Sequence, residues 1–70
     1  MKTYTINTKG FQDTVNIIQD GADIKLWHTT DGKDYLINTF DPDMYDDQFI
    51  EEYALRYIND FYEDGIEILN

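Results

Sequence analysis

The sequence predicts an α+β fold in a single domain over residues 1–70, with a four-stranded antiparallel meander packed against one long helix. Three observations predict it. Glycines at positions 10, 21 and 32 recur every eleven residues in dipeptides typical of hairpin turns. The segments between them are rich in Thr, Val, Ile and Tyr, which favour strands. Residues 41–64 instead repeat apolar side chains at helical spacing.

The predicted strands are residues 2–8, 11–19, 22–30 and 33–40. We expect two-residue turns at Lys9-Gly10, Asp20-Gly21 and Asp31-Gly32. This register gives one row across the sheet with Tyr4, Val15, Leu26 and Ile37, and another with Ile6, Asp13, His28 and Tyr35. Most apolar side chains then share one face, whereas a one-residue slip would scatter them. The opposite face would carry Phe40 and the cross-strand pair of Trp27 and Leu36.

Residues 11–20 also allow a first helix, which would change the order to β-α-β-β-α-β. Phe11, Val15 and Ile18 share a helical stripe, and Gly21 suits a helix C-terminal cap. The many β-branched residues in this segment favour a strand instead.

The long helix is predicted over about residues 42–63. Asp41 suits the N-cap, and Pro42 suits the first helical position. An apolar stripe that includes Ile50, Ala54 and Ile58 would close the core over the sheet. After Asp64-Gly65, residues 66–69 are predicted as a short final strand at a sheet edge.

The charge of the chain is strongly negative and unevenly placed. Fifteen acids face five bases, a net charge of −10. Residues 41–70 hold ten of these acids and one base, Arg56, four residues after Glu52, whereas residues 1–40 are nearly balanced. Direct binding to nucleic acid or to an anionic membrane would be opposed by this field. The chain has no cysteine, and no apolar run is long enough for a signal peptide or a membrane span, so we expect a cytoplasmic protein.

The sequence contains no catalytic signature. It has one histidine, no nucleophile–base set and no phosphate-binding glycine loop, so we expect neither enzymatic activity nor a cofactor. Acids at positions 41, 43, 47 and 52 have the spacing of a calcium loop, but Tyr45 and Asp46 occupy positions that such a loop reserves for a ligand and a glycine, so no metal site is predicted. His28, in a row with Asp13 and Tyr35, is expected to be a hydrogen-bonded structural residue.

The candidate site is an acidic surface that binds a protein. Carboxylates four residues apart on a helix lie about 6 Å apart along its axis, close to the spacing of phosphates on a nucleic-acid strand. Such a surface could occupy the basic groove of a nucleic-acid-binding protein, such as a nuclease. The predicted contact residues are Asp41, Asp43, Asp46, Asp47, Glu51, Glu52, Asp60, Glu63, Asp64 and Glu67. A second candidate interface consists of Trp27 and Leu36.

In size, charge, aromatic content and sheet–helix pattern, the chain resembles small phage-encoded DNA-mimic inhibitors. These include anti-CRISPR proteins, anti-restriction proteins and uracil-DNA glycosylase inhibitors. The resemblance implies a stoichiometric inhibitor of a DNA- or RNA-binding enzyme in the host cytoplasm, and it transfers no site residue. Two alternatives stay open: an immunity, antitoxin or adaptor module that binds a basic protein without mimicry, and a structural homodimer joined through Trp27, Leu36 and an edge strand.

Overall fold

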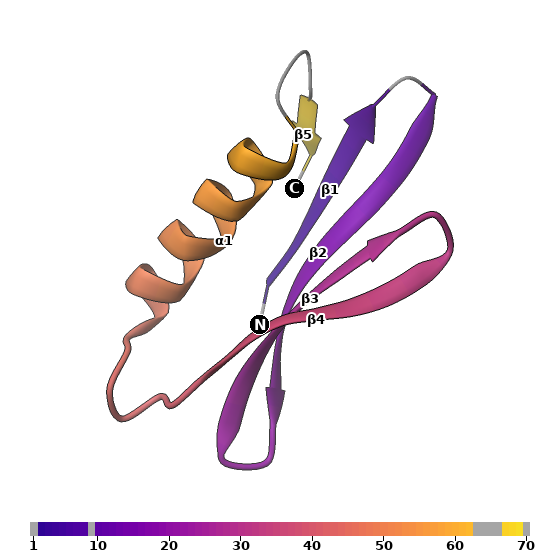
Figure 1. Cartoon of the computed structure of the whole chain (residues 1–70). Helices are drawn as coiled ribbons and strands as arrows, with labels where there is room; N and C mark the ends of the chain where they lie inside the picture. Colours follow the sequence, from indigo (N-terminus) through magenta and orange to yellow (C-terminus); the bar gives the residue numbers. More distant parts are fainter. Residues whose placement is uncertain (1, 9, 63–66, 70) are drawn as a thin grey trace.

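The computed structural model describes residues 2–8, 10–62 and 67–69, and it confirms the predicted α+β fold. A four-stranded antiparallel meander is followed by one helix (Figure 1). The elements are β1 (Lys2–Thr8), β2 (Phe11–Asp20), β3 (Asp23–Thr30), β4 (Lys33–Phe40), α1 (Asp47–Phe61) and β5 (Glu67–Leu69). The sheet order is β4-β3-β2-β1-β5, so the short final strand pairs with β1 at an edge, as predicted. The alternative helix over residues 11–20 is wrong, because this β-branched segment forms β2.

Two of the three predicted turns are confirmed by the register of their strands. Thr8 pairs with Phe11 in the first hairpin, and Thr30 pairs with Lys33 in the third. Asp31 and Gly32 both have positive φ, at 54° and 73°. This is the backbone of a type I′ turn, which matches the right-handed twist of the flanking strands.

The turn between β2 and β3 lies one residue later than predicted. Gly21 and Ala22 form it, so Asp20 pairs with Asp23, and the register between the two strands slips by two residues. Gly21 has a φ of 63°, as the first central position of a type II′ turn requires, and glycine takes that position without strain. Because the slip is an even number of residues, every side chain stays on its predicted face. The predicted rows were nevertheless wrong: Val15 lies opposite His28 rather than Leu26.

A β-bulge in β4 changes the end of the last strand. Trp27 pairs with Leu36 as predicted, but the next pair is Leu26 with Asn38. The extra residue moves Phe40 opposite Ile24, on the core side of the sheet. The placement of Phe40 on the outer face was therefore wrong, and its side chain is only 3% exposed.

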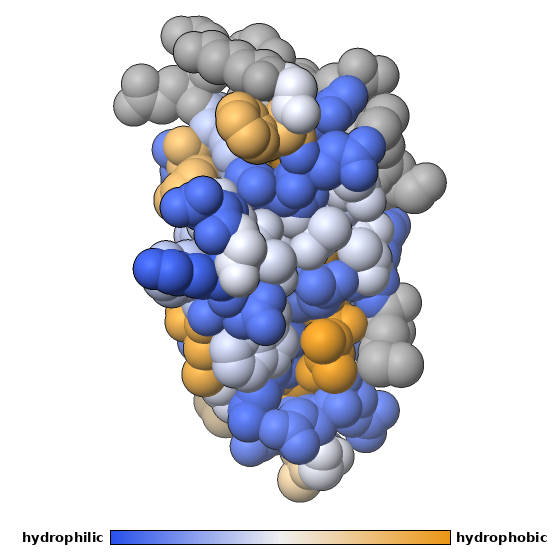
Figure 2. All heavy atoms as spheres, turned by 90° about the vertical axis from the view of Figure 1, so that its right-hand side faces the viewer, coloured by the Kyte–Doolittle hydropathy of each residue, from blue (hydrophilic) through white to orange (hydrophobic). Residues whose placement is uncertain are grey.

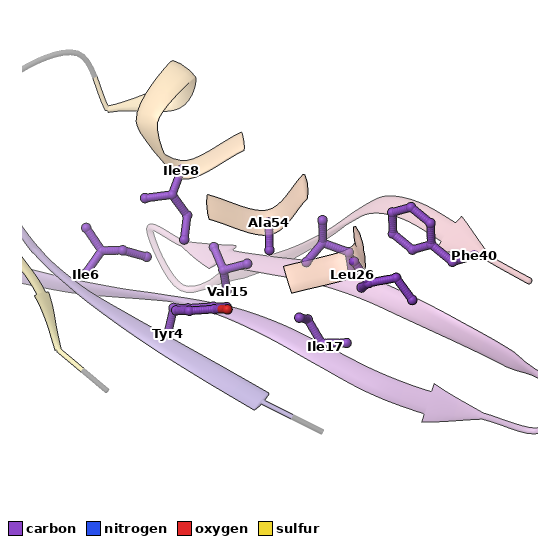
Figure 3. Close-up of a cluster of buried hydrophobic side chains, with 9 residues drawn as sticks. Tyr4, Ile6, Val15, Ile17, Leu26, Phe40, Ala54 and Ile58 are labelled. Atoms are coloured by element: carbon purple, nitrogen blue, oxygen red, sulfur yellow. The ribbon is translucent and has the colours of Figure 1, made fainter. Parts of the chain in front are cut away.

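The core lies between one face of the sheet and α1 (Figures 1 and 3). The helix contributes three residues at successive four-residue steps, which share one side of a helix. The sheet contributes residues from all four meander strands. The buried apolar side chains are Tyr4, Ile6, Val15, Ile17, Leu26, Phe40, Ile50, Ala54 and Ile58.

Helix α1 begins five residues later than predicted and ends two residues earlier. The Asp41 carbonyl accepts hydrogen bonds from the N–H groups of Met44 and Tyr45, at 3.0 and 3.1 Å, in a turn that does not continue. The N-cap is Asp46, whose extended backbone ends that turn and whose side chain accepts the Phe49 N–H at 2.8 Å. At the other end, Tyr62 has an extended backbone and lies outside the helix.

The outer face of the sheet, opposite α1, is polar to mildly apolar. Figure 2 shows this side as mostly white and blue surface with separate orange patches. None of the helices in the described ranges is long and apolar enough to cross a membrane.

Candidate protein-binding surface

Four of the predicted contact residues form an exposed group before and at the start of α1. We call Asp41, Asp43, Asp46 and Asp47 the acidic loop, and all four are exposed. Two of them also hold the backbone: the Asp41 Oδ1 accepts the Asp43 N–H at 2.9 Å, and the Asp46 Oδ1 accepts the Phe49 N–H at 2.8 Å. These bonds fix the direction of both carboxylates. No basic residue lies between Asp41 and Glu52 in the sequence.

The other described acids of α1 lie on different sides of the helix. Glu51 points toward β1, where its Oε1 is 3.2 Å from the Lys2 Nζ. Glu52 is exposed and accepts a hydrogen bond from the Gln48 Nε2 at 3.2 Å. Asp60 is exposed and, at 100° per residue, is turned by about 80° from Glu52. Glu52 and Asp60 therefore lie on the outer half of α1 and Glu51 on the side that faces β1, so the three carboxylates do not form a single row.

For three predicted contact residues, the structure does not describe the side chain. Glu63 and Asp64 lie outside the described residues. Glu67 begins β5, where its backbone is paired with Asn7 of β1. This pairing puts Glu67 on the edge strand beside β1, away from the acidic loop along the sheet (Figure 1).

Few ion pairs offset the negative charge in the part of the chain that the structure describes. Its two ion pairs are Lys2 with Glu51, at 3.2 Å, and Lys25 with Asp20, at 2.6 Å. Arg56 is exposed and joins neither pair, although Glu52 lies four residues before it, at the spacing of an ion pair on a helix. The acidic loop thus has no ion-pair partner among the described residues.

The second candidate interface lies on the outer face of the sheet. Trp27 and Leu36 form the predicted cross-strand pair, with Trp27 half-buried and Leu36 48% exposed. Ile18 on β2 is also exposed on this face. Trp27 and Ile18 line a shallow hollow of about 200 Å³ together with Asn16, Thr29 and Asp34.

A buried polar network joins the end of α1 to the sheet. His28, on β3, is only 1% exposed, and its two ring nitrogens each lie 2.7 Å from a tyrosine hydroxyl: Nδ1 from Tyr57 and Nε2 from Tyr62. The Tyr62 hydroxyl donates to the Asp13 Oδ2 at 2.5 Å, and the Thr30 hydroxyl donates to the same oxygen at 2.9 Å.

The direction of these hydrogen bonds fixes the tautomer of His28. Because the Tyr62 hydroxyl gives its only proton to Asp13, it must accept the Nε2–H of His28. Burial lowers the pKa of His28 below 6.5, although the Asp13 carboxylate opposes part of this effect. The neutral ring therefore accepts the Tyr57 hydroxyl proton at Nδ1. Burial and the Asp13 carboxylate also raise the pKa of Tyr62 above 10.

An open hollow of about 510 Å³ lies beside this network, between α1 and β4. Its wall includes Phe61, whose ring meets that of His28 edge-on with centroids 4.7 Å apart. Both ring nitrogens of His28 already have partners, so the ring offers the hollow no free hydrogen-bonding atom. We therefore assign the network a structural role.

His28 has some of the neighbours that the sequence predicts and others that it does not. Tyr35 does pair with His28 across β3 and β4, as predicted. Asp13 reaches it through Tyr62 rather than directly, because the two-residue slip moves Asp13 out of the predicted row. The partners Tyr57 and Tyr62 were missed, and their five-residue spacing carries no motif signal. What could have suggested them is the position of two tyrosines at the end of the apolar stripe that faces the sheet.

No group of three or more His, Asp or Glu side chains close enough to hold a metal ion occurs within residues 2–8, 10–62 and 67–69. Comparison of the chain with known protein families, with curated proteins and with solved structures gives no match.

Proposed function

We propose that this protein is an acidic binding protein that inhibits a nucleic-acid-binding enzyme, such as a nuclease of a host defence system, by occupying its basic groove. In this role it has no enzymatic activity of its own and acts in the host cytoplasm. The observation that carries the proposal is the acidic loop, in which four exposed carboxylates lie within seven residues without an ion-pair partner among the described residues.

Electrostatics supports a basic partner. Like charges at this spacing repel each other, and a solubilising surface of mixed sign would avoid this repulsion. A groove lined by Lys and Arg removes this repulsion. When a carboxylate array enters it, counterions are released from both surfaces, so affinity should fall steeply as salt rises.

The geometry also supports a rigid array. The Asp41 and Asp46 side chains are held by backbone N–H groups, and Asp47 begins a helix whose core side is buried. Charged groups that are fixed before binding lose less conformational entropy when they meet a partner. A flexible acidic tail would lack this advantage.

Charge reversal tests the proposal. Target proteins are captured from a bacterial lysate on the immobilised protein at low salt and released by added DNA or RNA. Asp43→Lys and Asp47→Lys should each weaken capture, and the double variant should nearly abolish it. The matched control is Asp23→Lys, which makes the same charge change at an exposed position at the start of β3. If the control weakens capture equally, only net charge matters, and if nucleic acid releases no captured protein, the mimicry proposal is wrong.

One observation favours a second candidate, a homodimer. Leu36 and Ile18 are exposed beside Trp27 on the outer sheet face, which no described element covers. Sedimentation equilibrium of the parent protein and of Trp27→Ala tests it. A mass of twice 8.3 kDa that falls to one chain in the variant would support the dimer.

A further inference from the structure

An exposed aromatic cluster adjoins the acidic loop. The rings of Tyr45 and Phe49 stack with centroids 4.8 Å apart and an interplanar angle of 25°. Both rings meet the buried Phe40 edge-on, at 5.8 and 6.4 Å, which ties the stack to the core. Tyr45 is 38% exposed, Phe49 44% and Met44 72%. We call Met44, Tyr45, Phe49 and the four carboxylates of the acidic loop the acidic–aromatic knob.

The apolar and acidic groups of the knob share one surface. A shallow hollow of about 400 Å³ is lined by Pro42, Asp43, Met44, Tyr45, Asp46 and Phe49. Exposed apolar side chains next to fixed carboxylates give this surface two kinds of contact: Coulombic attraction to a basic partner and burial of apolar area.

A surface that imitates phosphates alone does not need exposed rings. Burying them in a complex contributes free energy in proportion to the apolar area, and this contribution is not screened by salt as the attraction between charges is. The partner must therefore carry an apolar or aromatic platform among its Lys and Arg side chains. Grooves for single-stranded nucleic acid have this combination, because unpaired bases stack on aromatic or guanidinium planes while the backbone follows a basic channel. Grooves for duplexes meet mainly phosphates, since the base faces are hidden.

We propose that the acidic–aromatic knob enters a groove built for single-stranded nucleic acid, where its carboxylates take the place of phosphates and its stacked Tyr45 and Phe49 rings take the place of bases. This inference rests on the proposed function and narrows it to one class of partner. The charge complementarity comes from the acidic loop, and the stacking surface comes from the rings that Phe40 holds.

Competition with two nucleic acids tests the class of partner. Proteins captured from a bacterial lysate on the immobilised protein are eluted at constant salt with a single-stranded DNA of about thirty nucleotides or with a duplex of the same sequence. The single strand should release the captured protein at about tenfold lower concentration. Equal or better release by the duplex would overturn the single-strand assignment and leave the proposed function standing. Release by neither would overturn the proposed function itself.

Variants of the rings test the contact. Phe49→Ala, with all carboxylates intact, should raise the dissociation rate of the captured protein about tenfold and leave the salt dependence of binding unchanged. Asp43→Asn should instead reduce the salt dependence. The matched control is Leu55→Ala, because Leu55 is 37% exposed on the same helix but outside the knob.

Phe49→Leu separates ring stacking from simple apolar burial. Leucine keeps an apolar contact with Phe40 but removes the ring, so binding should stay several-fold weaker than that of the parent. Parent-like dissociation of Phe49→Leu would overturn the stacking role, and parent-like dissociation of Phe49→Ala would overturn the whole knob. Unchanged thermal unfolding of each variant shows that the effect belongs to the interface.

Discussion

The hydroxyl of Tyr62, the first residue after α1, donates a hydrogen bond of 2.5 Å to Asp13 on β2 across 49 residues of sequence. The same hydroxyl accepts the Nε2–H of His28 on β3. One side chain thus joins the end of the helix to two neighbouring strands. The end of α1 is held over the sheet by directional bonds as well as by apolar packing.

Tyr62→Phe should destabilise the protein by about 1–3 kcal/mol, because it leaves the buried His28 Nε2–H without an acceptor and removes a donor from Asp13. Urea denaturation followed by circular dichroism measures the loss. Tyr4→Phe is the matched control: Tyr4 is 2% exposed, and its hydroxyl has no hydrogen-bond partner in the described part of the chain. That change should be neutral or stabilising, and an equal loss in both variants would contradict the role of the Tyr62 bonds.

Stability should fall as the pH drops below about 6.5. Burial lowers the pKa of His28 in the folded state, so the unfolded chain binds a proton more readily and gains stability relative to the fold as the pH falls from 6.5 through the lowered pKa. Above 6.5 the contribution of neutral His28 is complete. His28 is the only histidine, so NMR of its ring protons reports its titration directly. A titration midpoint at or above 6.5 would contradict the neutral, buried state assigned to it.

Asp46→Ala should cost about 0.5–2 kcal/mol, because it removes the side chain that accepts the Phe49 N–H at the start of α1. Asp46→Asn should retain most of the stability, since asparagine caps a helix as well as aspartate. Asp43→Ala is the control for charge, because it lies in the same loop and its side chain caps no helix. Thermal unfolding measures the stability of each variant. Equal losses of stability at positions 43 and 46 would show that the loss comes from the removed charge and not from the missing cap.

Phe40→Ala should cost about 3–5 kcal/mol, because the bulge in β4 buries this ring in the core. Leu36→Ala, on the same strand but 48% exposed on the outer face, should cost at most about 1 kcal/mol. Chemical denaturation of both variants compares them. A small loss for Phe40→Ala would mean that β4 follows the regular register, with Phe40 on the outer face.

The sequence predicts the meander and the helix because two independent signals agree, the spacing of the glycines and the change of apolar period after residue 40. Alternation of side chains specifies a strand pairing only to within an even number of residues. It therefore placed Val15 on the correct face without finding its true neighbour, His28. The turn could be Asp20-Gly21, with glycine second as in a type I′ turn, or Gly21-Ala22, with glycine first as in a type II′ turn. Both turn types accept glycine, so the sequence does not choose between them.

Other features depend on tertiary contacts that a linear pattern does not contain. The bulge that buries Phe40 has no local signal such as a glycine within β4. The start of α1 at Asp47 rather than Pro42 was ambiguous, because Asp41, Asp43 and Asp46 are all suitable caps. For the candidate site, the sequence predicted the acids, but the contact of the Tyr45 and Phe49 rings with Phe40 depends on the bulge that turns Phe40 toward the core.

The position of β5 beside β1 has a consequence for the order of folding. The meander strands are joined by two-residue turns, so their pairing involves short-range contacts, whereas three pairs join β5 to β1 across almost the whole chain. Loop closure over that distance delays the β1–β5 ladder, and few contacts hold it once formed. In native-state hydrogen exchange, the amides that this ladder protects should therefore exchange through a local opening of low free energy. The amides between β2 and β3 should exchange only through global unfolding.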